Sequence, residues 1–492
     1  MLLLCRPLTV EPAVLPAARK CCFSRARLHG LSTAAASGGA TAASSSSSST
    51  GSNNRPAPQD DPKINAAVRK WGVMQPTAVT LQDLCETGLD RGRRREHGVF
   101  LHQELRIRMA QRVLELHGLP YGLPEQPGIR DVIRWYSRFV LDLERSPVPE
   151  TEAQDEEFTS MLSHIFEEHS EVIQAMAKGV QSLMMQLGDG YDEVQPHVDA
   201  SLRRFFMSRI GLRFLLQHHI ESFNNRPGHS GILQLDCSPA EVVRKCAQDS
   251  MGLCRASLGQ SPRIIVEETL AGQSGYFTYV PMHLSYMMTE LFKNACRSTT
   301  ELHATSGFDD LLPPIRCHIV HGNEDVTIKV SDEGGGMSRK QLKNVFKFMY
   351  TTCKKSPWES EQENSKGNSF AESGFVAVRP QCGDSVGNPL QRQKKGVLAG
   401  YGVGLSLSRL YAMYFGGDLK LLSIDGFGTD AYLHLNRLGT NCENLPAMVR
   451  HSPSMRDSSF VAEEDQDVGE LLISAEEEAF MLQELAAQRR RQ

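Results

Sequence analysis

The chain has no long hydrophobic run and little net charge. None of its apolar stretches approaches the about 20 residues that a membrane-spanning helix needs. Its 53 Lys and Arg residues are nearly balanced by 58 Asp and Glu residues, and the formal net charge is −5. Nucleic-acid-binding proteins usually carry a basic excess, which is missing here. The composition therefore argues against a membrane span and against a nucleic-acid partner.

The cysteines lack the spacing of a metal or disulfide site. Twelve are scattered along 492 residues, and no two form a CxxC pair. Zinc sites and small disulfide frameworks both need closely and regularly spaced cysteines. We therefore expect reduced and mostly buried thiols.

Acidic residues are almost absent from the first 55 residues. Glu11 stands there against six Lys and Arg residues, and a Ser/Ala-rich stretch covers 33–54. Basic, Ser-rich and acid-poor composition is typical of an organelle transit peptide. We predict such a peptide with a disordered spacer over 1–60. An unstructured tail without a targeting role is the alternative.

Residues 61–228 are predicted to be mostly helical. Apolar residues recur there at intervals of three and four, the period of a helix with one buried face. Four segments show the pattern: 100–120, 127–144, 157–187 and 198–223. Four long amphipathic helices in succession indicate a helical bundle.

Residues 229–440 mix strand and helix patterns. Residues 263–268 read as a strand, and alternating apolar runs predict two hairpins, at 315–332 and at 418–436 with its turn at Asp425-Gly426. Helical patterns cover 281–303 and 404–415. The order predicts an α/β sandwich with an antiparallel or mixed sheet, and a two-domain α+β chain overall.

Two polar segments complete the chain. Residues 354–398 lack any period and are too long for an ordinary loop, which predicts a lid or disordered insert. The tail, 441–492, is acidic and predicts an amphipathic helix, which either docks on a partner or stays solvated. Its apolar positions are Val468, Leu472, Ala475, Ala479, Leu482 and Ala486.

The helix predicted at 281–303 carries polar residues on one face. Glu290, then Lys293 or Asn294, then Arg297 recur at helical spacing after the apolar run LSYMM. A carboxylate, an amide and two cations on one face suit proton transfer, a metal ion and a polyphosphate. A solvated helix face is the alternative.

Three glycine motifs follow along the chain. SDEGGGMS places Asp332 at a strand end, where it can accept a hydrogen bond from an adenine amino group. GYGVGLSLSRL starts at Gly400 and opens a helix, but a polar insert precedes it instead of the strand that a dinucleotide fingerprint requires. GFGTD, at 426–430, is the turn of the last hairpin. Each motif alone could be a plain glycine turn.

In sequence order the motifs read ExxKN, DxGxG, GxGxG and GxGT. This order resembles the GHKL, or Bergerat, ATP-binding fold of DNA gyrase and histidine kinases. The stretches TELFKNACRST, IKVSDEGGGM and LAGYGVGLSLSRLYAMYFGGDLKL, with FLHQELRIRMAQRV and HSEVIQAMAKGV in the helical half, resemble the mitochondrial 2-oxoacid dehydrogenase kinases more closely. The resemblance covers roughly 65–440.

The resemblance implies an architecture and a location. It implies an N-terminal four-helix-bundle regulatory domain at 61–228 and a C-terminal GHKL α/β sandwich with a mixed sheet at 229–440, with the ATP lid at 354–398. It favours a mitochondrial matrix address over a plastid one. A homodimer that binds the lipoyl domain of the acyltransferase core is also expected.

The resemblance further implies transfer of the ATP γ-phosphoryl group to a serine of a decarboxylase subunit. Glu290 would take the hydroxyl proton, Asn294 would hold Mg²⁺ and Asp332 would bind adenine. The other residues expected around ATP are Leu291, Phe292, Lys293, Ala295, Cys296, Arg297, Gly334, Gly336, Thr351, Thr352, Gly400, Tyr401, Gly402, Val403, Gly404, Leu405 and Thr429. His169 and Arg209 match the family's allosteric 2-oxoacid pocket.

Two questions stay open at this point. WYSRFVLDL and ENLPAMV resemble the pyruvate-type enzymes, whereas Tyr286, the long insert and Gly416-Gly417 resemble the branched-chain type. The pyruvate dehydrogenase complex is the first choice of substrate and the branched-chain complex the alternative. HQELR, beginning at His102, also looks like the phospho-acceptor box of a histidine kinase, a more distant alternative.

Overall fold

The computed structural model describes residues 62–88, 91–224, 226–303, 312–352 and 402–446. The described residues all belong to one compact unit, Met1–Met448. The predicted transit peptide, the 354–398 insert and the tail helix lie outside them. In the part of the chain that is described, no helix is both long and apolar enough to span a membrane.

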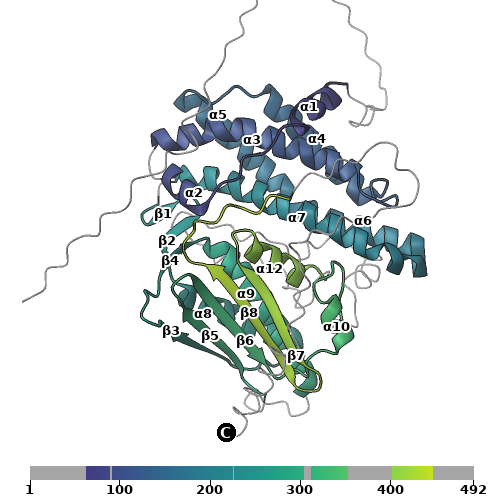
Figure 1. The fold of residues 1–492 in the computed structure, drawn as a ribbon, viewed down its shortest axis with the longest axis vertical. Helices are drawn as coiled ribbons and strands as arrows, with labels where there is room; N and C mark the ends of the chain where they lie inside the picture. Colours follow the sequence, from purple (N-terminus) through teal and green to yellow (C-terminus); the bar gives the residue numbers. More distant parts are fainter. Residues whose placement is uncertain (1–61, 89–90, 225, 304–311, 353–401, 447–492) are drawn as a thin grey trace, which may run out of the picture. The chain divides into compact units, whose positions relative to one another are not determined.

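The N-terminal half is helical, as predicted (Figure 1). Thr80 and Thr151 each start a helix with a capping box, and Pro127 occupies the first turn of another. The helices are α1 (Pro62–Gly72), α2 (Leu81–Thr87), α3 (Arg91–His117), α4 (Pro127–Arg145), α5 (Glu152–Glu168), α6 (Val172–Leu187) and α7 (Tyr191–Ser222), with short 3₁₀ turns η3 (His169–Glu171) and η4 (Gly188–Gly190).

The expectation of a single helix over 157–187 is wrong. The structure divides this segment into α5 and α6 at the 3₁₀ turn His169–Glu171. The guanidinium of Arg209 donates to the His169 carbonyl at 2.7 Å, and that of Arg213 donates to the Phe166 carbonyl at 3.1 Å. These tertiary bonds satisfy backbone carbonyls at the interruption, where regular helical bonding ends. Neither glycine nor proline marks the position in the sequence.

The C-terminal half contains the predicted mixed sheet. Five strands lie in the order β3-β5-β6-β8-β7, with β3 and β5 parallel and every other pair antiparallel. Both predicted hairpins are confirmed, the second with its turn at Asp425-Gly426. The strands are β3 (Ile264–Thr269), β5 (Ile315–His321), β6 (Asp325–Asp332), β7 (Asp418–Ile424) and β8 (Gly428–Asn436).

Helices cover one face of this sheet (Figure 1). Leu284, Met287, Leu291 and Phe292 are buried on the inner side of α9, whereas Glu290, Lys293 and Asn294 stay partly exposed. A small second sheet, which the sequence did not suggest, has the order β1-β2-β4. The added elements are α8 (Pro239–Leu258), α9 (Pro281–His303), α10 (Arg339–Asn344), α12 (Gly404–Met413), β1 (His229–Ser230), β2 (Leu233–Cys237) and β4 (Phe277–Tyr279).

Three buried histidines meet within the helical half. The ring of His97 lies 5.5 Å from that of His218 and 5.6 Å from that of His219, measured between centroids. Burial lowers the pKa of His218 to about 3, and the neighbouring His219 adds to the effect. Burial also lowers the pKa of His97 and His219. The folded chain therefore holds this cluster neutral at pH 7.

We expect the folded chain to lose stability as the pH falls below 6.5. The unfolded chain protonates His218 near pH 6.5, whereas the folded chain does so only near pH 3, so the unfolded state binds more protons in between. His218→Leu should reduce the slope of unfolding free energy against pH by up to about 1.4 kcal/mol per pH unit in this range. Urea unfolding at several pH values measures it. The exposed His164→Leu is the control, and an unchanged slope in His218→Leu would contradict the prediction.

Candidate active site

Helix α9 divides the first predicted motif into two faces. Glu290 and Lys293 are partly exposed, and the Lys293 ammonium donates to Glu290 Oε1 at 2.8 Å. Arg297 Nε lies 3.9 Å from Glu301 on the same helix. Asn294 is partly exposed as well. The remaining members of the motif have side chains packed into the core: Leu291, Phe292, Ala295 and Cys296.

The second motif follows the end of β6. Asp332 Oδ1 accepts a hydrogen bond from the Gly334 amide at 2.9 Å, and Asp332 pairs with Thr429 of β8 in the sheet. Thr429 Oγ1 lies 2.9 Å from Ser423 Oγ. The predicted Asp332 and Thr429 therefore sit side by side at one end of the sheet.

The third motif leads into α12. Gly402 has a left-handed φ of 74°, which favours glycine, and α12 begins two residues later at Gly404. Neither a side-chain cap nor an acidic residue occupies the first turn of α12. Its backbone N–H groups and the positive end of its dipole suit a phosphate. Gly400 and Tyr401 lie outside the described residues.

Three glycines lie where the backbone of one motif passes close to another segment of the site. A side chain at any of them would collide with that segment. A Cβ on Gly334 would lie 2.3 Å from Ser298 Oγ on α9, and one on Gly404 would lie 2.2 Å from Glu290 Oε2. A Cβ on Gly428 would lie 2.0 Å from the Asp332 carbonyl oxygen. The motifs of α9, β6, α12 and β8 thus converge at one place.

The remaining predicted residues lie around the point where the four motifs converge. Gly336 has a φ of 66°, and a Cβ there would lie 2.0 Å from the Ile424 carbonyl oxygen of β7. Thr351 and Thr352 are exposed. Val403 is buried beneath the start of α12, and Leu405 is partly buried.

Burial changes the ionisation of two groups at the site. It raises the pKa of Asp332 to about 6, although the Gly334 and Thr429 amides oppose the shift. Burial, followed by the charge of Glu290, raises the pKa of Tyr286 well above its usual range. Tyr286 lies one turn before Glu290, and its ring centroid is 5.1 Å from that of Tyr411. Tyr411 was not predicted, and only its place on α12 brings it here.

The donors present fit Mg²⁺ bound together with a nucleotide. Asn294 offers an amide oxygen on the same helix as Glu290, and Mg²⁺ is usually held by one or two protein oxygens plus phosphates and water. No group of three or more His, Cys, Asp or Glu residues in the described part of the chain could hold a metal by itself.

His169 and Arg209 meet inside the helical half. Arg209 donates to the His169 carbonyl oxygen, and both residues are buried. The ring of His169 packs 4.7 Å from Tyr136 and 4.8 Å from Phe139, between centroids. Among the described residues, neither His169 ring nitrogen has a hydrogen-bond partner. A buried guanidinium beside imidazole nitrogens that lack such partners suits a small carboxylate.

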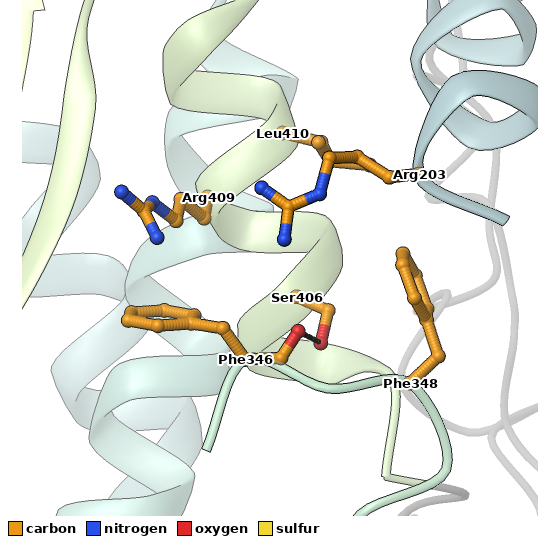
Figure 2. Close-up of a pocket in the computed structure, with 6 residues that line it drawn as sticks. All are labelled: Arg203, Phe346, Phe348, Ser406, Arg409 and Leu410. Atoms are coloured by element: carbon orange, nitrogen blue, oxygen red, sulfur yellow. Dashed lines mark hydrogen bonds between the residues drawn. The ribbon is translucent and has the colours of Figure 1, made fainter. Parts of the chain in front are cut away.

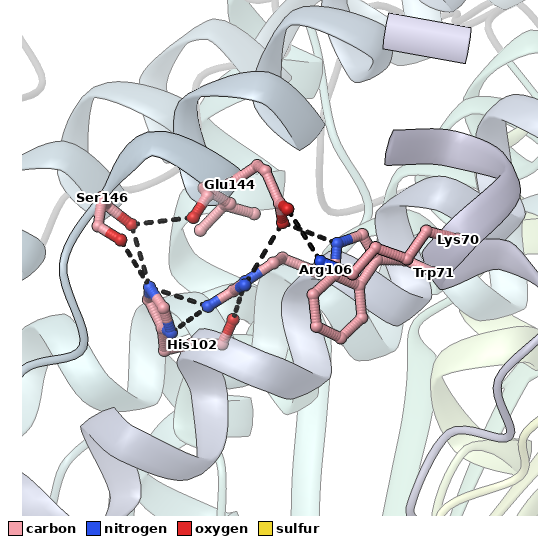
Figure 3. A network of polar contacts seen from close by, with 7 residues as sticks. Lys70, Trp71, His102, Arg106, Glu144 and Ser146 are labelled. Carbon is pink, nitrogen blue, oxygen red and sulfur yellow. Dashed lines mark hydrogen bonds and ion pairs between the residues drawn. The ribbon is translucent and has the colours of Figure 1, made fainter. Parts of the chain in front are cut away.

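His102 lies in a polar network with Arg106, Glu144 and Ser146 (Figure 3). It is 3% exposed, and its Nε2 lies 2.9 Å from the Ser146 carbonyl oxygen. Arg106 contacts the His102 ring and reaches Glu144 at 3.2 Å. A phospho-acceptor must be reached by a nucleotide, and this burial disfavours that role.

Comparisons with known proteins place both halves of the chain in known families. Residues 78–238 match the family described as mitochondrial branched-chain alpha-ketoacid dehydrogenase kinase, and residues 279–438 match the histidine kinase-, DNA gyrase B- and HSP90-like ATPase family. A mitochondrial pyruvate dehydrogenase (acetyl-transferring) kinase of Arabidopsis thaliana is 39% identical over 384 residues, which are 77% of this chain and 95% of that protein.

Two mammalian relatives are similar over the same range. Isozyme 1 of this mitochondrial kinase is 33% identical in Rattus norvegicus, over 403 residues, and 33% identical in Homo sapiens, over 406. Each match covers 79% of this chain and 84% of the relative. The chain belongs to the mitochondrial 2-oxoacid dehydrogenase kinase family, within the GHKL superfamily of ATPases and kinases.

Proposed function

We propose that this chain is an ATP-dependent protein-serine kinase that phosphorylates and inactivates the decarboxylase subunit of the pyruvate dehydrogenase complex. The observation that carries the proposal is the convergence of the four motifs, with Glu290 against Gly404 at the start of α12. The relatives at 33–39% identity are named for this reaction. Their names also support a mitochondrial location, which we take to be the matrix.

Each group of the site has a role in this reaction. Glu290 takes the proton of the attacking serine hydroxyl, and its ion pair with Lys293 at 2.8 Å fixes the position of the carboxylate. The N–H groups that open α12 bind phosphate oxygens, and Asp332 accepts a hydrogen bond from the adenine amino group. Asn294 would hold Mg²⁺, which supplies positive charge next to the transferring phosphoryl group.

The remaining predictions concern regulation and assembly. We infer that residues 61–228 form a four-helix-bundle regulatory domain in which His169 and Arg209 bind a small 2-oxoacid. We also infer that the chain is a homodimer and that it binds a lipoyl domain of the acyltransferase core. In the described part of the chain, the buried ring nitrogens of His169 have no hydrogen-bond partner, which supports the binding of a 2-oxoacid there.

The branched-chain complex is the second candidate substrate. The helical half matches the family named for that kinase, and Tyr286 lies beside Glu290, where a histidine is usual in the pyruvate type. A tyrosine there packs on Tyr411 and does not ionise near neutral pH, because burial and the Glu290 charge raise its pKa.

A side-by-side assay tests the proposal. The chain is incubated with Mg-ATP and either the purified pyruvate or the purified branched-chain dehydrogenase complex, and phosphoserine on each decarboxylase subunit is measured by mass spectrometry. We expect phosphorylation of the pyruvate complex and loss of its activity. Phosphorylation of the branched-chain complex alone would show that this complex, and not the pyruvate complex, is the substrate. Acid-labile phosphate on His102, with no phosphoserine, would overturn both.

A further inference from the structure

A carboxylate of the helical half contacts the turn that precedes the nucleotide loop. Asp199 lies on α7, and its Oδ1 accepts a hydrogen bond from the Phe348 amide at 3.1 Å. Both residues are buried, at 8% and 3% exposure. Residues 346–350 follow α10 and lead directly to Thr351 and Thr352. We call these residues the 346–350 turn.

The 346–350 turn is held from two sides. On the α7 side, the Phe348 ring stacks on Phe206 at 5.1 Å between centroids, and the Lys347 ammonium donates to Gln195 Oε1 at 3.1 Å. On the α12 side, the Ser406 hydroxyl donates to the Phe346 carbonyl at 2.8 Å, and the Arg409 guanidinium lies 4.8 Å from the Phe346 ring centroid (Figure 2). The turn therefore links the helical half to the helix that opens the phosphate site.

The backbone of the turn is strained next to the Asp199 contact. Met349 has a φ of 64°, a left-handed backbone conformation that residues other than glycine rarely adopt. Such a conformation costs on the order of 1–3 kcal/mol and persists only where its surroundings hold it. The peptide that follows supports the nucleotide loop, because a Cβ on Gly402 would lie 2.6 Å from the Tyr350 carbonyl oxygen and 2.7 Å from the Met349 carbonyl carbon.

We propose that Asp199 is a positioning residue for ATP binding: by bonding the Phe348 amide, it holds the 346–350 turn in the conformation that places Gly402 and Thr351 at the nucleotide. The inference rests on the proposed function, since it takes these residues as the ATP site. The contact carries no chemistry of its own, and its effect reaches the nucleotide through the backbone of the turn.

The charges around Asp199 suit a carboxylate in this place. Burial raises its pKa to about 6, while the Phe348 amide and the charges of Lys347 and Arg203 oppose the shift, so it is ionised at pH 7.5. Arg409 of α12 faces Arg203, and Tyr191 lies at the start of α7. The positive charges of Lys347 on the turn and Arg203 on α7 thus act on Asp199, and the charge of Arg409 on α12 acts on Arg203.

The experiment compares variants at Asp199 in the full chain at pH 7.5. Asp199→Ala should exchange the Phe348 amide hydrogen at least about ten-fold faster than wild type, because the acceptor is gone. It should raise the dissociation constant for ATP about ten-fold, with kcat at saturating ATP within about two-fold of wild type. Asp199→Asn keeps an acceptor oxygen and should restore both values to within about three-fold.

Matched variants keep the test decisive. Asp192→Ala removes an exposed carboxylate from the same helix and should match wild type in exchange and affinity. In Asp199→Ser the side chain is too short to reach the Phe348 amide. This variant replaces Asp199→Ala in the test if Asp199→Ala does not fold. Wild-type exchange and affinity in the Ala or Ser variant, or a loss of kcat at unchanged affinity, would overturn the proposal, as would failure of Asp199→Asn to restore binding.

The test of Asp199 can fail or succeed independently of the test of the proposed function. Hydrogen exchange and ATP titration require neither dehydrogenase complex. A wild-type chain that binds ATP but phosphorylates neither complex contradicts the proposed function and leaves the Asp199 test standing. Normal phosphorylation with unaltered exchange in Asp199→Ala contradicts only the role of Asp199.

Discussion

Glu290→Gln is expected to lower the rate of serine phosphorylation by at least about 100-fold, the scale of a lost general base. The glutamine amide occupies the same space but cannot take the hydroxyl proton. The affinity for ATP should stay within about three-fold of wild type, because the adenine and phosphate contacts come from other elements. Phosphoserine formation at saturating Mg-ATP gives the rate, and calorimetric titration with ATP gives the affinity.

The same helix provides a matched control. Glu301 is a second glutamate of α9, its side chain is 58% exposed, and it lies 3.9 Å from Arg297. Glu301→Gln should keep the wild-type rate. Full activity of Glu290→Gln would remove Glu290 from the mechanism. An equal loss of rate in both variants would point to a change in α9 as a whole rather than to the missing base.

Glu443→Ala is expected to destabilise the chain by about 3–5 kcal/mol, the usual cost of leaving a buried charge without its partner. Glu443 lies beyond the last strand, and its side chain is fully buried. Its carboxylate accepts from Arg108 at 2.6 and 2.9 Å, from the Val79 amide at 3.0 Å and from the Tyr414 hydroxyl.

The charges explain the size of the expected loss. Burial by itself lowers the pKa of Arg108, but Glu443 and then Glu104 outweigh it and raise the pKa above its usual value. Without Glu443, the guanidinium keeps Glu104, at 2.7 Å, as its remaining carboxylate contact among the described residues, together with the Thr77 carbonyl, at 2.7 Å. The variant then loses most of the attraction between charges that offsets the cost of removing the Arg108 guanidinium from water.

Urea unfolding with linear extrapolation measures this effect. The control is the exposed pair of Arg134 and Asp131, 2.9 Å apart with side chains 50% and 44% exposed. Asp131→Ala should change the unfolding free energy by less than about 1 kcal/mol. A similarly small change in Glu443→Ala would show that the buried pair is not needed for stability.

Local patterns were sufficient for much of the architecture. Apolar residues at intervals of three and four marked α3, α4 and α7, since a helix must bury one face. Alternating residues marked β5 to β8, because a strand turns every second side chain inward. The break between α5 and α6 escaped this reasoning. It depends on Arg209 and Arg213, which are distant in sequence and bond the carbonyls there.

The least predictable site residue was Asp199, although a signal was present. Asp199 shares the apolar stripe of α7 with Leu202 and Phe206, three and seven residues later, and both are buried. A carboxylate at such a position must find a partner. The sequence does not say which partner, and the Phe348 amide is 149 residues away.

By itself, the sequence determined the family of the protein and predicted the residues of its site. The order of Glu290, Asp332, the Gly402–Gly404 loop and Thr429 needs no coordinates, because each motif is short and its residues are neighbours in the chain. Only the tertiary structure decided which of these side chains meet and what holds them. Gly334, Gly404 and Gly428 act through contacts between distant segments, and Asp199 and Glu443 act through partners on other elements. Such contacts depend on packing in three dimensions, and the spacing of residues along the chain does not say which distant segments meet.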